Sequence, residues 1–95
     1  MVKAVIGVNQ MTKVRIVFFA SLKESLGQED AFIELSQPTS IEEIKQILNG
    51  LLPNPDPLFA DGIQASIDYE FARDSSKVDP ETVKEIAFFP PVTGG

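Results

Sequence analysis

One segment near the middle of the chain has the hydrophobic spacing of a long amphipathic helix. Apolar side chains recur at helical intervals along residues 41–51: Ile41, Ile44, Ile47, Leu48 and Leu51. Ser40 and Glu43 form a capping-box pattern at its start, and Asn49-Gly50 is a typical stop signal near its end. A helix with one apolar face needs a surface to bury that face, so the rest of the chain is expected to supply one.

The segments on both sides of this helix have the pattern of strands. Alternation of apolar and polar residues predicts strands over residues 13–19, 31–35 and 64–69, and an apolar run predicts a closing strand over 84–89. In the third strand this alternation places Tyr69 on the same face as Ala65 and Ile67. Residues 71–73 either continue that strand or form a short partner strand.

A second, shorter helix is predicted after the first strand. Ser21 and Glu24 have the spacing of another capping box, and Gly27 is expected to end the helix after one or two turns. Further along, Pro53, Pro55 and Pro57 predict a surface loop after the main helix, because proline lacks an amide donor and restricts the residue before it.

The order of these elements predicts an α+β fold of the β-grasp type, a mixed sheet covered by one main helix. The first and last strands are expected side by side, which puts the chain end at one end of the sheet. Residues 12–95 are predicted to form one domain with a flexible C-terminal tail over residues 90–95. Residues 1–11 are expected to form an N-terminal extension. Two interpretations of residues 1–10 stay equally open: an upstream start or appended segment, and an additional N-terminal strand.

Composition excludes several classes of function. Eight basic and 14 acidic side chains give a net charge of −6, so binding to nucleic acid phosphates is not expected. The chain has no cysteine and no histidine, which removes the thiol nucleophile and the commonest general base. No apolar stretch approaches the roughly 20 residues that span a bilayer, and no signal peptide is recognised, so a cytoplasmic location is expected.

The chain ends in a motif suited to chemistry at its own carboxylate. Residues 88–95 read Phe-Phe-Pro-Pro-Val-Thr-Gly-Gly, so a strand-like run stops at two prolines before two glycines. Glycines without a Cβ can pass a narrow channel, and the prolines restrict the base of the tail to extended conformations. Adenylation by ATP would activate the Gly95 carboxylate for attack by sulfur or by an amine.

This ending resembles that of the ubiquitin-like sulfur carriers that form the small subunits of molybdopterin synthases. Residues 14–20 are similar to the first strand of that family, 40–48 to its main helix and 65–70 to its middle strand. The resemblance covers about residues 12–95, and the terminal motif is its most specific part. Three features depart from it: Asp68 stands where the family usually has asparagine, Val83 stands where the family has a glycine-containing turn, and residues 1–10 match nothing in the family.

The resemblance implies a cycle of sulfur transfer in molybdenum cofactor biosynthesis. An adenylating enzyme that uses ATP would activate Gly95, and a sulfur donor protein would convert it to a thiocarboxylate. The tail would then enter the large subunit of a heterotetrameric synthase and give its sulfur to a cyclic pterin precursor. Gly94 would provide a slim approach, and the partner-binding residues would be Phe88, Phe89, Pro90, Pro91, Val92 and Thr93. The chain alone is expected to be non-catalytic and to bind no cofactor.

Three alternatives stay open at this point. A sulfur carrier of the thiazole pathway is similar in fold and also ends in Gly-Gly, although the Phe-Phe-Pro-Pro run favours the molybdopterin branch. A ubiquitin-like protein modifier would instead join Gly95 to a lysine through an isopeptide bond. A plain binding module would keep its function after deletion of Gly94 and Gly95.

Overall fold

The structure is a computed structural model that describes residues 11–91. It contains strands β1 (Thr12–Phe18), β2 (Asp30–Leu35), β3 (Thr39–Ser40), β4 (Gln64–Ile67), β5 (Glu70–Ala72), β6 (Lys77–Val78) and β7 (Ile86–Phe89). The helices are α2 (Ala20–Leu26), α3 (Ile41–Leu51) and the short 3-10 helix η1 (Asp56–Phe59). The predictions for residues 1–10, and those for Val92, Thr93, Gly94 and Gly95, lie outside the described residues.

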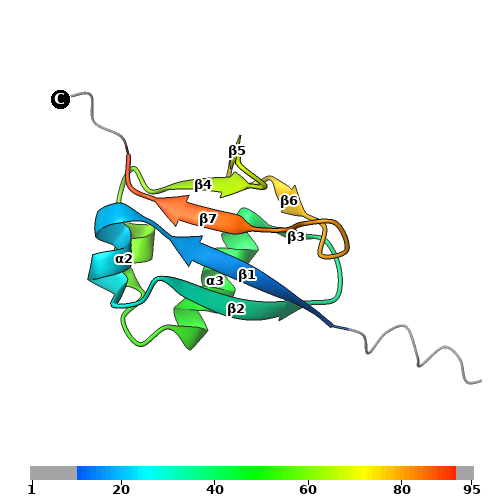
Figure 1. The fold of residues 1–95 in the computed structure, drawn as a ribbon, viewed down its shortest axis with the longest axis horizontal. Coiled ribbons are helices and arrows are strands. Elements are labelled where there is room, and N and C mark those ends of the chain that lie inside the picture. Colours follow the sequence, from blue (N-terminus) through cyan, green and yellow to red (C-terminus); the bar gives the residue numbers. More distant parts are fainter. Residues whose placement is uncertain (1–10, 92–95) are drawn as a thin grey trace, which may run out of the picture.

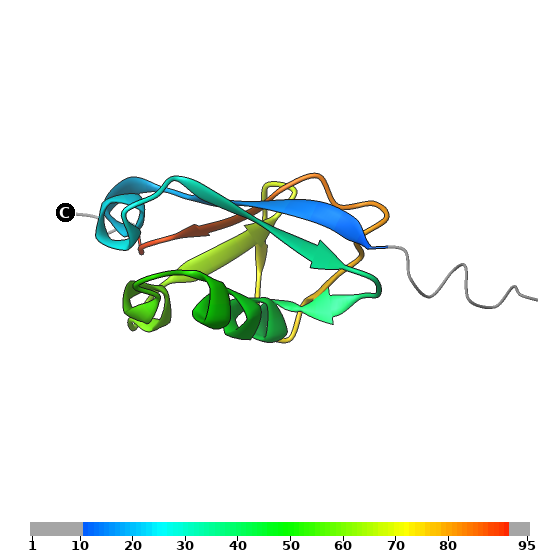
Figure 2. The same cartoon turned by 90° about the horizontal axis from the view of Figure 1, so that it is seen from below.

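Five strands form a mixed sheet in the order β2-β1-β7-β4-β5 (Figure 1). β1 and β7 are parallel neighbours, while β1 pairs with β2, β4 with β7, and β4 with β5 in antiparallel fashion. Figure 2 shows α3, drawn in green, on one side of this sheet. The predicted α+β fold of the β-grasp type, with the first and last strands adjacent, is confirmed.

The core lies between α3 and the inner face of the sheet. β1 contributes Val14, Ile16 and Phe18, all of which are buried, and β7 contributes Ile86 and Phe88. These side chains alternate along their strands with residues that face the other side, as the two-residue period predicts. Burial of apolar surface between the two layers is the main stabilising contribution to a domain of this size.

The helix predicted along residues 41–51 is confirmed, although the Asn49-Gly50 signal is not what ends it. The Ser40 hydroxyl accepts from the Glu43 backbone N–H at 3.1 Å, and the Glu43 carboxylate accepts from the Ser40 N–H at 3.0 Å. The helix passes through Asn49 and Gly50 to Leu51, and an extended Leu52 ends it just before Pro53. Proline disfavours helical geometry in the residue before it, so it outweighs the Asn-Gly signal.

The apolar face of α3 is narrower than the sequence predicts. Ile41, Ile44 and Leu48 are fully buried, but Ile47 and Leu51 are exposed by 36% and 58%. Leu52, beyond the helix, is buried and takes part in the core instead. A five-residue stripe is therefore only partly covered by the sheet.

The short helix α2 begins two residues earlier than predicted, with its N-cap at residue 19 in place of residue 21, and without a capping box. Its N-cap is Phe19, whose backbone N–H still donates to the Phe88 carbonyl of β7 at 3.1 Å. The chain then turns sharply at Ala20, with φ of 55°, so Ser21 lies inside the first turn and does not cap it. The predicted end at Gly27 is confirmed, with φ of 79° and a bond from its N–H to the Lys23 carbonyl.

Candidate functional site: the carboxyl end of strand β7

β7 brings the base of the tail to the middle of the sheet. It lies between β1 and β4, and its last ladder pair joins Phe89 to Gln64. The ladder ends there because Pro90 and Pro91 have no backbone N–H to donate. The tail therefore starts from a strand that is held on both sides, at the end of the molecule marked C in Figure 1.

The structure separates the predicted partner-binding residues into different environments. Phe88 is fully buried and stacks on Phe18, so its side chain acts as an anchor in the core and presents no surface to a partner. Phe89 and Pro90 are half-buried, and Pro91 is exposed. The remaining four predicted site residues belong to the part of the tail beyond the described residues.

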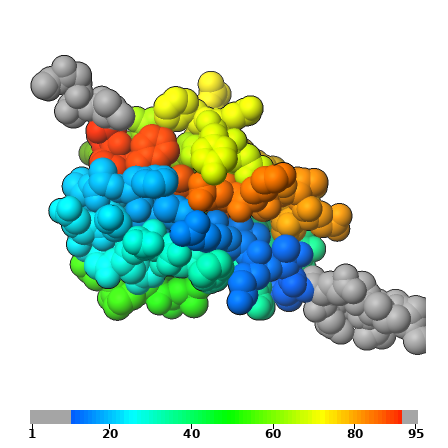
Figure 3. Space-filling view, viewed as in Figure 1, coloured from blue at the N-terminus to red at the C-terminus, as the bar shows by residue number. Residues whose placement is uncertain are grey.

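Aromatic side chains gather on the outer face of the sheet next to this point. They line a groove of about 270 Å³, here called the aromatic groove, which is formed by Phe19, Ser66, Tyr69, Phe71, Glu85, Ala87 and Phe89. Phe71 and Phe89 pack at a tilt with ring centroids 5.9 Å apart. Figure 3 shows the β4–β5 hairpin in yellow directly beside the orange and red end of β7. The base of the tail thus continues from one wall of the groove.

Two aromatic residues of the groove are unusually exposed for a folded domain. Tyr69 is 82% exposed and Phe71 is 79% exposed. Small residues, Ser66 on β4 and Ala87 on β7, form the floor between the aromatic rings. An exposed apolar surface of this kind, beside polar side chains, is typical of a protein interaction site.

The turn between β4 and β5 carries the exposed tyrosine, which corrects its predicted placement. β4 ends at Ile67, and Asp68 and Tyr69 form a two-residue turn with φ of 50° and 73°. Tyr69 therefore does not share the inner face with Ala65. Of the two predictions for residues 71–73, the partner strand is confirmed, because β5 pairs with β4.

Asp68 fixes this hairpin to the start of β7. Its Oδ1 atom accepts from the backbone N–H of Lys84 at 2.7 Å and from that of Glu85 at 2.9 Å. Its own N–H donates to the Glu85 carbonyl at 2.9 Å. The carboxylate that departs from the family pattern thus satisfies two backbone donors and holds Tyr69 in place above the groove.

Charged side chains border the aromatic groove on its β1 side. Arg15 donates to Asp30 of β2 at 3.2 Å, and its Nη1 atom lies 3.5 Å from Glu85. The Arg15 side chain is 42% exposed, so these pairs contribute little to stability. They leave a surface that combines aromatic rings with both signs of charge.

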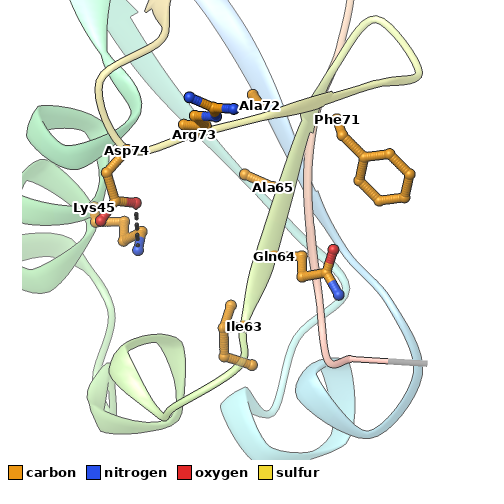
Figure 4. A pocket seen from close by; sticks show the side chains of 8 residues that line it. All are labelled: Lys45, Ile63, Gln64, Ala65, Phe71, Ala72, Arg73 and Asp74. Atoms are coloured by element: carbon orange, nitrogen blue, oxygen red, sulfur yellow. Dashed lines mark ion pairs between the residues drawn. The ribbon is translucent and has the colours of Figure 1, made fainter. Parts of the chain in front are cut away.

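A second hollow, of about 330 Å³, lies between α3 and the β4–β5 hairpin (Figure 4). Lys45 of α3 forms an ion pair with Asp74 at 3.0 Å across it. Figure 4 shows that the Phe71 ring points away from that pair, and the same ring lines the aromatic groove. Lys45 is thus already paired with Asp74.

Within residues 11–91, no group of three or more potential metal ligands comes together. None of the helices described there is long and apolar enough to cross a membrane. The alternation of residues could have revealed Ser66, Ala87 and Phe89 as outward positions on neighbouring strands. Nothing in the sequence pattern pointed to Phe19 as part of the same surface.

Comparison with known proteins places the fold among small ubiquitin-like proteins. The structure matches the crystal structure of SAMP1 from Haloferax volcanii with a TM-score of 0.67 and 23% identity, covering 87% of this chain and 99% of that one. It also matches a putative molybdopterin converting factor, subunit 1, from Pyrococcus furiosus, with a TM-score of 0.64 and 16% identity, covering 85% and 99%. At these identities the likeness confirms the fold.

Sequence comparison confirms the resemblance inferred from the terminal motif. The chain is 26% identical over 85 residues to a protein of Caenorhabditis briggsae named molybdopterin synthase sulfur carrier subunit, covering 90% of this chain and 100% of the relative. Residues 16–95 match the ThiS family, which is most of the chain, including the whole tail. On this match, the chain belongs to the ThiS family.

Proposed function

We propose that this protein is the sulfur carrier subunit of a molybdopterin synthase. The observation that carries the proposal is the position of the tail. It emerges from β7, a strand in the middle of the sheet, next to an exposed aromatic groove. The name of the Caenorhabditis briggsae relative, a molybdopterin synthase sulfur carrier subunit, supports the same function. A thiazole-pathway carrier and a protein modifier would be activated by the same chemistry. The experiments below distinguish these two alternatives from the proposed function.

The proposed chemistry takes place at the carboxylate of Gly95. An oxygen of this carboxylate attacks the α-phosphorus of ATP on an activating enzyme, and pyrophosphate leaves. The outer sulfur of a persulfide on a donor protein then attacks the acyl carbon and expels AMP, which gives an acyl disulfide. A second thiol of the donor attacks the donor's sulfur in that disulfide, so that a new disulfide forms on the donor and the thiocarboxylate leaves. In the synthase the thiocarboxylate gives its sulfur to a cyclic pterin precursor. The protein itself supplies the reacting terminus, and its partners supply the catalytic groups and the ATP site.

The folded body would dock outside the partner's active site while the tail enters it. The four residues 92–95 reach about 13 Å when fully extended, which is enough to pass through a protein channel. The aromatic groove begins at Phe89, just before the tail, so we assign it as the surface that contacts the large subunit. The net charge of −6 would steer the protein towards a basic surface around the channel entrance.

Intact mass spectrometry tests the proposal. Incubation with ATP, an activating enzyme of the matching class and a sulfur source should replace one oxygen of the terminal carboxylate by sulfur. A variant lacking Gly94 and Gly95 is the negative control, and Gly50→Ala, on α3, is a control for handling and folding. Absence of the sulfur-containing species with every activating enzyme offered would overturn the proposal.

A second measurement separates a carrier from a modifier. If the thiocarboxylated protein converts a cyclic pterin precursor in the presence of a large subunit, the molybdopterin branch is supported. Covalent adducts between Gly95 and lysines of other proteins would instead favour the modifier. Thiocarboxylate formation without pterin conversion, but with transfer to a thiazole precursor, would favour the thiazole branch.

A further inference from the structure

The turn before β4 lies opposite the first residues of the tail. In the antiparallel register of β4 and β7, Gln64 is the partner of Phe89. The same register, continued by two residues, brings Gly62 opposite Pro91. Backbone hydrogen bonds stop at Phe89 because prolines cannot donate, so contact between these two segments depends on packing.

Gly62 packs directly against the Pro91 ring. A Cβ atom at position 62 would lie 3.1 Å from Pro91 Cγ and 3.4 Å from Pro91 Cδ, which is closer than ordinary carbon contacts. Gly62 also has φ of +87°, a conformation that side chains rarely adopt. Glycine is therefore required at position 62 for two reasons: the positive φ of the turn and the close approach of the Pro91 ring.

The turn that carries Gly62 is itself held by the core. The Ile63 N–H donates to the Ala60 carbonyl at 3.3 Å, which closes a turn with Gly62 at its third position. On one side of the turn Leu58 is fully buried, and on the other side Ile63 packs against the core. Pro91 is thus placed by a rigid turn on one side and by the end of β7 on the other.

We infer that Gly62 is a positioning residue for the chemistry at the carboxyl terminus. By leaving room for the Pro91 ring, it sets the point and direction from which residues 92–95 enter the activating enzyme. This inference rests on the proposed sulfur-carrier function. A side chain at position 62 would displace Pro91, at the root of the tail, by a few tenths of an ångström.

The chain offers a matched control for the backbone strain. Gly27, at the end of α2, has φ of +79°, and a Cβ atom added there would meet nothing within 4 Å. Gly27→Ala therefore introduces similar strain without touching the tail. We expect both substitutions to lower the urea midpoint of unfolding, Gly62→Ala at least as much as Gly27→Ala, because only position 62 adds a clash to the strain.

The two variants should differ in the kinetics of thiocarboxylate formation. Measured with folded protein, Gly62→Ala should lower kcat by about 3- to 10-fold relative to Gly27→Ala, because small misplacements of a reacting group reduce rate. KM for the carrier should stay unchanged, because Gly62→Ala alters the root of the tail and leaves the rest of the folded body in place. Equal kcat values for the two variants would overturn the inference.

A double variant tests whether the effect passes through the proline. Pro91→Ala removes the ring that Gly62→Ala displaces, so the two changes should not be additive. The double variant should react no more slowly than Pro91→Ala alone. Independent, multiplicative losses in kcat would show that Gly62 acts by another route and would overturn the inference.

Failure of the inference is distinguishable from failure of the proposed function. If the wild-type protein forms no thiocarboxylate, the proposed function is wrong. In that case nuclear Overhauser contacts between the Gly62 Hα protons and the Pro91 ring still test whether the turn at Gly62 positions Pro91. Their presence in wild type and loss in Gly62→Ala would support that placement, and their absence in wild type would overturn it.

Discussion

Phe18 and Phe88 stack with their ring centroids 6.5 Å apart and an angle of 27° between the planes. The two residues are paired across the parallel strands β1 and β7, and both are almost completely buried. The contact joins the first and last strands of the sheet directly beneath the strand end that carries the tail. The same contact therefore stabilises the core and holds the end of β7, where Phe89 lies, in position.

Phe88→Ala should destabilise the protein by about 3–5 kcal/mol, the usual cost of deleting a buried aromatic ring. The change leaves a cavity in the core beside Phe18. Urea unfolding followed by circular dichroism measures the loss. Phe88→Leu is the control, since it retains most of the apolar volume and should cost clearly less. A loss below about 1 kcal/mol for Phe88→Ala would contradict the anchoring role.

The main helix and the central strands could be predicted because each follows a single strong rule. The capping box at Ser40 and the two-residue period of β1 both act locally, and both are found in the structure. The strands β3 and β6, two residues each, could not be predicted, because a two-residue strand has no period to detect. Their pairing arises from tertiary packing.

The tail motif was recognisable from the sequence, while the groove beside it was not. Phe19, Phe71 and Phe89 come from three separate parts of the chain and meet only through the sheet order. The turn at Asp68 and Tyr69 was misread as strand because a bulky residue with positive φ is rare, and no glycine marked the turn. Sequence patterns of this kind describe local geometry and miss surfaces assembled from distant strands.

Asp68→Ala should destabilise the protein by about 1–3 kcal/mol, because two backbone N–H groups of residues 84 and 85 lose their acceptor. Asp68→Asn retains an acceptor oxygen in the same position and should cost less. Thermal unfolding measures both variants. Equal losses for the two substitutions would indicate that the negative charge, and not the acceptor geometry, stabilises the hairpin.

The stability contributed by Glu43 should depend on pH. Bonds from the Ser40 backbone N–H and hydroxyl hold the pKa of the Glu43 carboxyl below its ordinary value of 4.5. Because the pKa is lower in the folded state, this contribution is complete above the unfolded pKa and is lost as the pH falls through the folded pKa. The difference in urea midpoint between wild type and Glu43→Gln should therefore shrink as the pH falls below 4.5.

Glu42→Gln is the control for this pH dependence. It removes an equal charge from the first turn of α3 without breaking the capping box. Its effect on the midpoint should change less over the same pH range. A difference for Glu43→Gln that stays constant from neutral to acidic pH would count against the capping interaction.

Phe71→Ser should weaken binding to the large subunit without unfolding the protein. The ring is 79% exposed and contacts Phe89, so its removal costs the core little, whereas aromatic residues often dominate interface energies. We expect a Kd increased by about tenfold or more in calorimetric titration with the large subunit. Phe32→Ser, an exposed phenylalanine outside the groove, should leave Kd unchanged. Equal effects of the two substitutions would exclude the groove as the docking surface.

Tyr69→Gly should have opposite effects on stability and on binding. Tyr69 adopts φ of 73° with an 82% exposed ring, so its conformation is strained while its side chain contributes little to the core. Glycine relieves that strain, and the free energy of unfolding should rise by about 1 kcal/mol. The same change removes an aromatic ring from the groove, so affinity for the large subunit should fall. Tyr69→Asn, which tolerates positive φ, should show the same opposition with a smaller gain in stability. A glycine variant that gains stability and keeps full affinity would show that the tyrosine has no role in docking.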